Sequence, residues 1–152
     1  MKDLRSLPSA DLCSYAEARY YLLLSSLKYF DLPYRLESAS VPAEILDRYM
    51  QVESEAYVTG QILASSCQTK PKLILYFFER GETNSMKAGK ILDSAKGEFV
   101  VLAFPVDTNS STVESLTKYF GITDYPSLVI CDQILDWPFT AEDVQEAEMK
   151  CK

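Results

Sequence analysis

The chain has 152 residues, of which 47% are hydrophobic, and a formal net charge of −7. These values are typical of a soluble globular domain, or of a compact domain with an added helical element. Because the chain contains no histidine, a Ser-His-Asp triad, a Cys-His dyad and a histidine-ligated metal site are excluded. An acidic chain without a basic cluster also argues against nucleic acids and anionic membranes as partners.

Neither a membrane-spanning segment nor a signal peptide is expected. The most apolar uncharged stretch, residues 20–27, is far shorter than the ~20 residues that a transmembrane helix needs. At the start of the chain, acidic positions follow the basic residues before any apolar stretch, unlike the pattern of a signal peptide. The sequence therefore predicts no membrane insertion by this chain.

Two amphipathic helices are expected before residue 70. In residues 10–30, apolar residues recur at spacings of three and four, which marks one face of a helix. These residues are Leu12, Ala16, Tyr20, Leu23, Leu27 and Phe30. A second helix is predicted over 42–66 by the stripe Ile45, Tyr49, Val52, Ala56, Gly60, Leu63 and Cys67. With 31–40 as their connection, the two helices should pack as an antiparallel hairpin.

After residue 70, short apolar runs alternate with helical patterns. Strands are expected at 73–78, 99–106, 128–131 and 134–137, and helices at 85–96, 113–120 and after Thr140. Gly97 and Gly121 are expected to end the first two of these helices, and Thr140 with Asp143 resembles a capping box before the last. The order β-α-β-α-β-β-α predicts an α/β fold in which the first two strands are parallel and the last two form a hairpin.

The amino-acid sequence of this second half resembles that of the thioredoxin family. Residues 77–93 (FFERGETNSMKAGKILD) are similar to its strand, active-site turn and helix. Residues 106–130 (VDTNSSTVESLTKYFGITDYPSLVI) are similar to its strand-end Asp, its Lys-Tyr-containing turn and its Pro-Ser-aliphatic strand. The resemblance implies a thioredoxin-like mixed sheet flanked by helices over 70–152, preceded by the antiparallel helical hairpin of 1–69. With its hairpin, the chain is more weakly similar to membrane-anchored thioredoxin-like proteins of small-genome archaea.

By position, the CxxC motif of the family falls on Glu82-Thr83-Asn84-Ser85. Thiol–disulfide catalysis needs a thiolate with a lowered pKa at a helix N-terminus and a second thiol that resolves the mixed disulfide. Neither thiol is present, so the resemblance implies that conventional oxidoreductase activity is lost. The cis-proline of the family falls on Pro126, and in active relatives this loop pairs its backbone with an extended substrate peptide.

The resulting hypothesis is a redox-inactive protein-binding or structural module that holds a polypeptide partner and needs no cofactor or metal. Its peptide-facing surface would comprise Arg80, Glu82, Thr83, Asn84, Ser85, Tyr125, Pro126 and Ser127. A second interpretation gives Pro126 a role in shaping the fold alone. Self-association is the second choice of partner, because the first helix has a wide aromatic surface made of Tyr15, Tyr20, Tyr21, Tyr29 and Phe30.

The turn from Arg80 to Ser85 admits two interpretations. Its helix N-terminus, with Arg80 and Lys87 nearby, has the features of an anion site. Alternatively it is an ordinary solvated turn in which Thr83 or Asn84 caps the helix. The acidic residues around it favour the ordinary turn because they oppose an anion.

Two further functions remain as alternatives. One is a thiol–disulfide oxidoreductase that uses a displaced cysteine, Cys67 or Cys131. The other is a glutathione-binding, transferase-like protein, although that family places its thioredoxin domain before its helices. The absence of a CxxC motif and of histidine favours a protein that is not an enzyme.

The four cysteines are widely spaced. Cys131 ends an apolar strand and is expected to be a small core residue, whereas Cys151 lies near the chain end without an identifiable partner. The antiparallel hairpin and the weaker resemblance suggest a disulfide between Cys13 and Cys67, but the greater length of the second helix leaves its geometry open. The weaker resemblance also points to an extracytoplasmic domain of an anchored parent, while the cysteines alone leave the compartment undecided.

Overall fold

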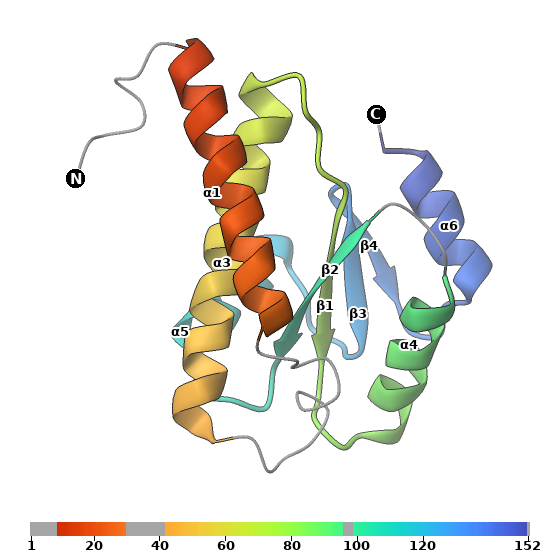
Figure 1. Cartoon of the computed structure of the whole chain (residues 1–152). Helices are drawn as coiled ribbons and strands as arrows, with labels where there is room; N and C mark the ends of the chain where they lie inside the picture. Colours follow the sequence, from red (N-terminus) through yellow and green to blue (C-terminus); the bar gives the residue numbers. More distant parts are fainter. Residues whose placement is uncertain (1–8, 30–41, 96–98, 152) are drawn as a thin grey trace.

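The structure is a computed structural model that describes residues 9–29, 42–95 and 99–151 (Figure 1). These residues form five helices and a four-stranded mixed sheet, which confirms the predicted α/β class. The connection expected over 31–40 and the helix end expected at Gly97 lie outside the described residues. Within the described ranges, no helix is both long and apolar enough to cross a membrane.

The sheet has the strand order β2-β1-β3-β4. Strand β1 (Leu73–Phe78) runs parallel to β2 (Val100–Pro105) and antiparallel to β3 (Ser127–Ile130), which pairs antiparallel with β4 (Gln133–Asp136). The predicted parallel pair and the predicted hairpin are therefore confirmed. The last two strands each begin and end one residue earlier than expected.

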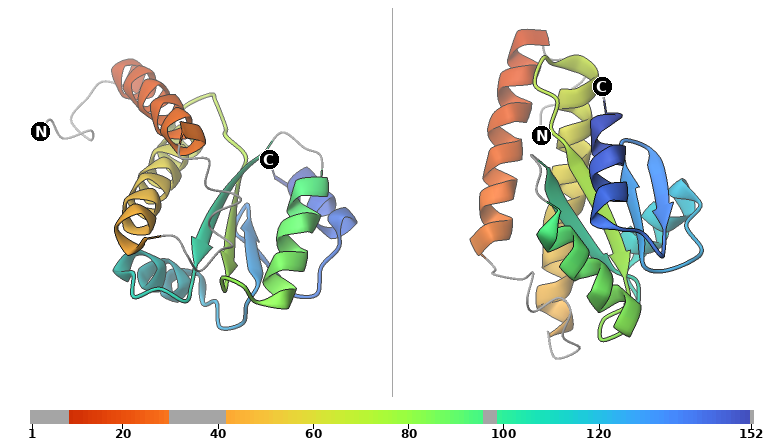
Figure 2. Two further views of the ribbon diagram at one scale, coloured as in Figure 1. Left: turned by 60° about the horizontal axis from the view of Figure 1, so that its bottom comes forward. Right: turned by 90° about the vertical axis from the view of Figure 1, so that its right-hand side faces the viewer.

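Helices cover both faces of this sheet, so the fold has three layers (Figures 1 and 2). One side holds α1 (Ser9–Tyr29), α3 (Ala43–Ser66) and α5 (Ser111–Phe120), and the other holds α4 (Thr83–Ser94) and α6 (Ala141–Met149). Strand β1 lies between the layers and is buried from Ile74 to Phe78. A strand that is covered on both faces has apolar residues at successive positions, which explains the continuous apolar run in this sequence.

The two N-terminal helices form the predicted antiparallel hairpin. The expected stripe of α1 is buried at Ala16, Tyr20, Leu23 and Leu27. One hydrophobic core contains buried residues of α1, α3 and strands β1, β2 and β3, and Leu135 of β4 packs against it, so the hairpin packs on the sheet and does not stand apart from it.

The buried face of α3 differs from the expected stripe. Ile45 is 43% exposed, whereas Leu46, Met50 and Glu53 are buried. Helix α3 contacts α1, α5 and β2, so its buried arc is wider than the single stripe that periodicity predicts. The unexpected member of this arc is Glu53, an acidic residue with a relative exposure of 0%.

Local side-chain chemistry sets the bounds of the two later helices. The Ser110 hydroxyl accepts the Val113 N–H at the start of α5, and Gly121, with φ +70°, ends this helix as predicted. The predicted capping box before α6 is confirmed, since Thr140 and Asp143 each accept the backbone N–H of the other.

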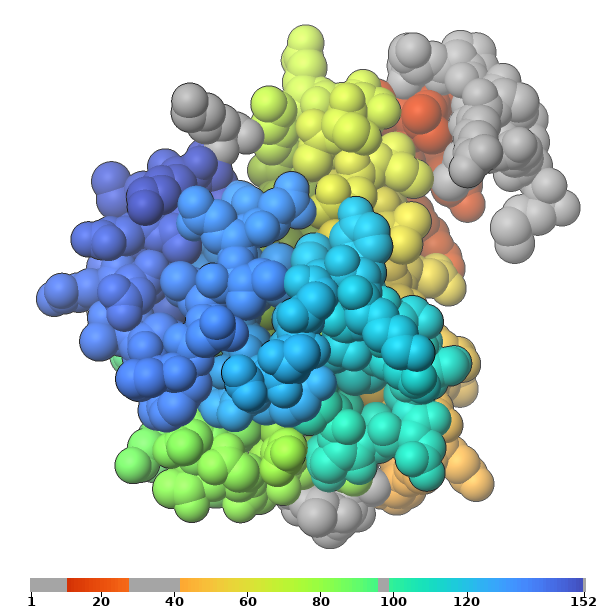
Figure 3. Space-filling model, turned by 180° about the vertical axis from the view of Figure 1, so that it is seen from behind, coloured from red at the N-terminus to blue at the C-terminus, as the bar shows by residue number. Residues whose placement is uncertain are grey.

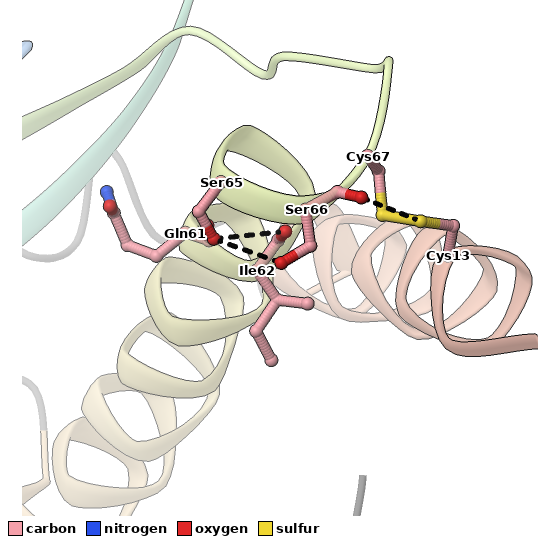
Figure 4. The surroundings of a disulfide bond; sticks show 6 residues. All are labelled: Cys13, Gln61, Ile62, Ser65, Ser66 and Cys67. Atoms are coloured by element: carbon pink, nitrogen blue, oxygen red, sulfur yellow. Dashed lines mark hydrogen bonds between the residues drawn. A yellow bond between two sulfur atoms is a disulfide. The ribbon is translucent and has the colours of Figure 1, made fainter. Parts of the chain in front are cut away.

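A disulfide joins the outer ends of the hairpin. It links Cys13 of α1 to Cys67, the residue that follows α3, and their Cα atoms are 5.7 Å apart, within the usual range for a disulfide. Figure 4 shows the two side chains meeting beside the last turn of α3. Cys67 has left the helix and has an extended backbone, with φ −129° and ψ 166°. The greater length of α3 therefore does not keep the two ends apart.

The expectation that Cys131 is a core residue is wrong. Cys131 is exposed in the two-residue turn between β3 and β4, where it and Asp132 have φ of 49° and 65°, the positive values of a type I′ hairpin turn. A second disulfide joins it to Cys151, and the two Cα atoms are 5.6 Å apart. The pairing arises because α6 brings the end of the chain back to this turn.

Candidate functional site

The candidate site lies at the edge of the sheet where β1 ends, at the lower end of that strand in Figure 1. Because β1 and β2 are parallel, both end at this edge, and the antiparallel β3 begins there with Ser127 opposite Phe77. The Val106 N–H donates to the Phe78 carbonyl oxygen at 2.8 Å and holds the two strand ends together. The fold thus brings to one edge the two segments that were expected to face a peptide, 80–85 and 125–127.

A carboxylate occupies the N-terminus of α4. Glu82 is the N-cap, and its two oxygens accept the N–H groups of Asn84 at 2.9 Å and Ser85 at 2.7 Å. These hydrogen bonds, the one from Asn84 foremost, lower the pKa of the Glu82 carboxyl. The helix therefore begins two residues earlier than expected, and the prediction that Thr83 or Asn84 caps it is wrong. The interpretation as an anion site also loses support, because the chain's own carboxylate takes the place of the anion.

Ser85 is fixed inside the turn and is only 1% exposed. Its hydroxyl oxygen accepts the Glu79 N–H at 3.0 Å. Its carbonyl oxygen accepts a hydrogen bond from the Tyr76 hydroxyl, a side chain of the central strand. Ser85 therefore connects α4 to β1 and is not an exposed nucleophile.

Arg80 links the turn to the end of β2. Its backbone N–H donates to Asp107 Oδ1 at 3.1 Å, and its Nε donates to Asp107 Oδ2 at 2.9 Å. The Arg80 side chain is only 14% exposed, so the pair is sheltered from solvent. Arg80 thus positions the turn and has little charge to offer an external ligand.

The peptide bond between Tyr125 and Pro126 is cis, as the resemblance implies. Pro126 and Ser127 are buried, and Tyr125 is half-buried. Ser127 Oγ donates to the Asp124 carbonyl oxygen and lies 3.3 Å from Asp136 Oδ1 on β4. Hydrogen bonds on both sides therefore hold this loop in place, so that Tyr125 is its outward-facing member.

A cavity of about 310 Å³ opens beside Tyr125. Its other walls are Val106 and residues of the loop and first turns of α5, including Asn109, Ser110 and Val113. The single charged residue among its walls is Glu114. The space beside the loop is therefore lined by hydroxyl, amide and apolar groups.

This arrangement offers several accessible side chains for contact with a ligand. The accessible residues are Glu82, Thr83, Asn84 and Tyr125, whereas the two serines of the expected surface are buried. In the part of the chain that the structure describes, no cluster of three His, Cys, Asp or Glu side chains is close enough to hold a metal ion.

Asp107, the strand-end Asp of the resemblance, belongs to this site although the expected peptide-facing surface does not include it. A signal for it exists, because it follows a buried strand that is parallel to β1, and the carboxyl ends of parallel strands meet at one edge.

Comparisons with known proteins identify no relative of this chain. No family model matches the chain, and neither a curated protein nor a solved structure matches it significantly.

Proposed function

We propose that the chain is a thioredoxin-like polypeptide-binding or structural module whose active-site turn has lost its thiol chemistry. One observation carries the proposal. Glu82 is the N-cap and Ser85 the third residue of α4, and the loop with the cis Tyr125-Pro126 bond begins the strand next to β1. These are the positions to which the two cysteines and the cis-proline of the family map. The strand order, with one parallel pair and a terminal hairpin, adds support.

Installing both thiols at these positions should restore the lost chemistry. We expect the double variant Glu82→Cys/Ser85→Cys to reduce insulin with dithiothreitol faster than the parent chain does. The N–H groups of a helix N-terminus lower the pKa of a thiol at the cap, and the second thiol resolves the mixed disulfide. Precipitation of the insulin B chain measures the rate.

The matched control is Thr83→Cys/Met86→Cys, which keeps the spacing but moves both thiols along α4 by one residue. Equal rates for the two double variants would contradict the proposed geometry. The parent chain is the third arm of the experiment. Clear turnover by its own cysteines would favour the oxidoreductase alternative and overturn the proposal.

Binding of an extended peptide should depend on Tyr125. We expect the parent chain to bind a fluorescent, carbamidomethylated insulin B chain, a model of an unfolded polypeptide. The change Tyr125→Ala should weaken this binding about fivefold or more, which corresponds to the ~1 kcal/mol that separates important from neutral interface residues. Fluorescence anisotropy measures the dissociation constant.

The control for this experiment is Tyr119→Ala on α5, which removes a tyrosine that is 79% exposed and lies outside the loop. An equal loss of affinity in both variants, or no binding by the parent chain, would contradict the proposed peptide-facing surface. Sedimentation velocity on the same samples separates peptide binding from self-association.

Self-association through α1 is the second candidate function. Tyr15 and Tyr21 are each 52% exposed and Leu22 is 57% exposed, so part of the aromatic surface of this helix is not used in packing. Contiguous patches of exposed apolar side chains mark interaction surfaces, whereas single exposed ones are normal.

For the compartment, we propose an oxidising one, as for an extracytoplasmic domain of an anchored parent. The pairing of all four cysteines in two disulfides supports this, because such bonds persist mainly outside the reducing cytosol.

A further inference from the structure

A second cavity lies at the opposite edge of the sheet, where β1 begins and β3 ends. It encloses about 390 Å³. Its walls come from the C-terminal half of α3, the segment that leads into β1, the turn between β3 and β4, and the chain after α6. Figure 3 shows this face, with α3 in yellow beside the blue segments of the C-terminal third.

Positive charge gathers at this cavity although the chain as a whole is acidic. Lys70, Lys72 and Lys150 line it, against the single acidic wall residue Asp132. Lys72 is partly neutralised, because its Nζ lies 3.6 Å from Glu148 Oε1. Among the described residues, Lys70 and Lys150 have no carboxylate oxygen within 4.0 Å. The cavity walls therefore carry more positive than negative side chains, on a chain with a net charge of −7.

The same cavity is lined by both cysteines of the second disulfide, Cys131 and Cys151. Cys131 is exposed and Cys151 is half-buried, so a solute in the cavity can reach the bond. Positive groups beside a disulfide favour exchange in two ways. They attract an anionic thiol, and they stabilise the thiolate that leaves when the bond breaks.

We propose that this cavity binds small anionic thiols, meaning low-molecular-weight thiols that carry a carboxylate, and that the Cys131–Cys151 disulfide exchanges with them. The site is separate from the Tyr125-Pro126 loop, and the proposal does not depend on the function proposed for that loop.

The exchange consists of two displacements. The thiolate of the ligand attacks Cys131 Sγ, so that a ligand–Cys131 disulfide forms while the bond to Cys151 breaks and Cys151 leaves as a thiolate. A second ligand thiolate then attacks the ligand sulfur and releases Cys131. Two thiols are thereby oxidised to one small-molecule disulfide, and the protein disulfide is reduced by two electrons, with protons taken up from water by the thiolates.

The test compares thiols of opposite charge on the two disulfides of one molecule. The protein is treated with 3-mercaptopropionate, which is anionic, or with cysteamine, which is cationic. After alkylation and digestion, mass spectrometry gives the reduction rate at each disulfide. The ratio of the anionic to the cationic rate at Cys131–Cys151 is divided by the same ratio at Cys13–Cys67, so that the intrinsic reactivity of each thiol cancels.

At low ionic strength we expect this quotient to be about fivefold or more, given one or two unpaired lysines near the reacting sulfur. It should fall towards one in about 1 M salt, where charges are screened beyond ~3 Å. The quotient at low ionic strength should also fall in the double variant Lys70→Gln/Lys150→Gln. It should keep its parent value in the double variant Lys87→Gln/Lys90→Gln, which makes the same change of charge on α4 outside the cavity.

A quotient near one at low salt would overturn the proposal. So would a quotient that survives the loss of Lys70 and Lys150, because the selectivity would then come from elsewhere in the protein. The double substitutions replace exposed residues and are expected to leave the fold intact, which the circular dichroism spectrum of each variant verifies.

Discussion

Replacing Cys13 and Cys67 together by alanine should lower the free energy of unfolding by about 4 kcal/mol. The bond closes a loop with a sequence separation of 54 residues, and a longer loop removes more entropy from the unfolded chain. The ion pair between Arg19 and Glu55, which also crosses the hairpin, cannot replace it, because exposed pairs of this kind contribute at most about 1 kcal/mol. Urea unfolding in a buffer without oxidant or reductant measures this decrease in the free energy of unfolding.

The matched comparison is Cys131→Ala/Cys151→Ala. This bond closes a loop with a separation of 20 residues, so its removal should cost about 3 kcal/mol, less than the first. A larger loss for the second pair would contradict the entropic argument and would mean that the C-terminal bond supports packing which the hairpin bond does not.

Glu53 should make the protein less stable as the pH rises above about 4.5. The side chain is fully buried on α3, and the interactions of its carboxylate with the Ala103 backbone and the Tyr49 hydroxyl do not offset that burial. Burial raises the pKa of this carboxyl well above its ordinary value of 4.5. The folded protein therefore keeps the proton at a pH where the unfolded chain has lost it.

The sign of the effect follows from proton binding. Between pH 4.5 and the higher pKa of the folded state, the folded chain binds more protons than the unfolded chain, so stability falls as the pH rises. The stabilisation is complete below the pKa of the unfolded chain and is lost as the pH approaches that of the folded chain. The limiting slope from one group is about 1.4 kcal/mol per pH unit.

The change Glu53→Gln should remove this slope and make the protein more stable than the parent at pH 7, by about 1 kcal/mol or more. Glu55→Gln is the control, because Glu55 lies on the same helix with its side chain 55% exposed. Urea unfolding from about pH 4 to pH 8 gives both slopes. A slope that is equal in the parent and in Glu53→Gln would show that Glu53 is ionised in the folded protein.

Tyr49 belongs to the same buried pair. Burial first, and then the neighbouring Glu53, raises the pKa of its hydroxyl, so Tyr49 stays neutral throughout this range and does not add to the slope. The pH dependence expected below pH 8 therefore belongs to the carboxyl.

Much of the fold could be predicted from the sequence because the patterns that specify it are local. The apolar run of 73–78 predicts a doubly covered strand, and the spacing from Ala16 to Leu27 predicts one helix face. Gly121 and the pair Thr140 and Asp143 act on the residues next to them, so they predict helix ends correctly.

The errors fall where a residue acts through a partner far away or against its usual preference. Glutamate is an uncommon N-cap, so Thr83 and Asn84 looked like better caps than Glu82. Glu53 is buried because α3 is covered by three elements at once, which a single stripe does not reveal.

The candidate site was predictable in part for the same reasons. The segments 80–85 and 125–127 could be chosen from the resemblance, whereas the pairing of Arg80 with Asp107 depends on which strand lies next to β1. The pairing of Cys131 with Cys151 likewise required the path of α6, since spacing alone does not determine which cysteines bond.

The two disulfides also determine how the molecule would respond to a mechanical load. Tension applied outside Cys13 and Cys151 passes through the first disulfide to Cys67 and leaves the chain again at Cys131. The stretches 14–66 and 132–150 carry none of it, and only the chain between Cys67 and Cys131 can be drawn out, to about 220 Å. That chain contains β1, β2 and β3, so these three strands would bear the load while α3, β4 and α6 stayed slack.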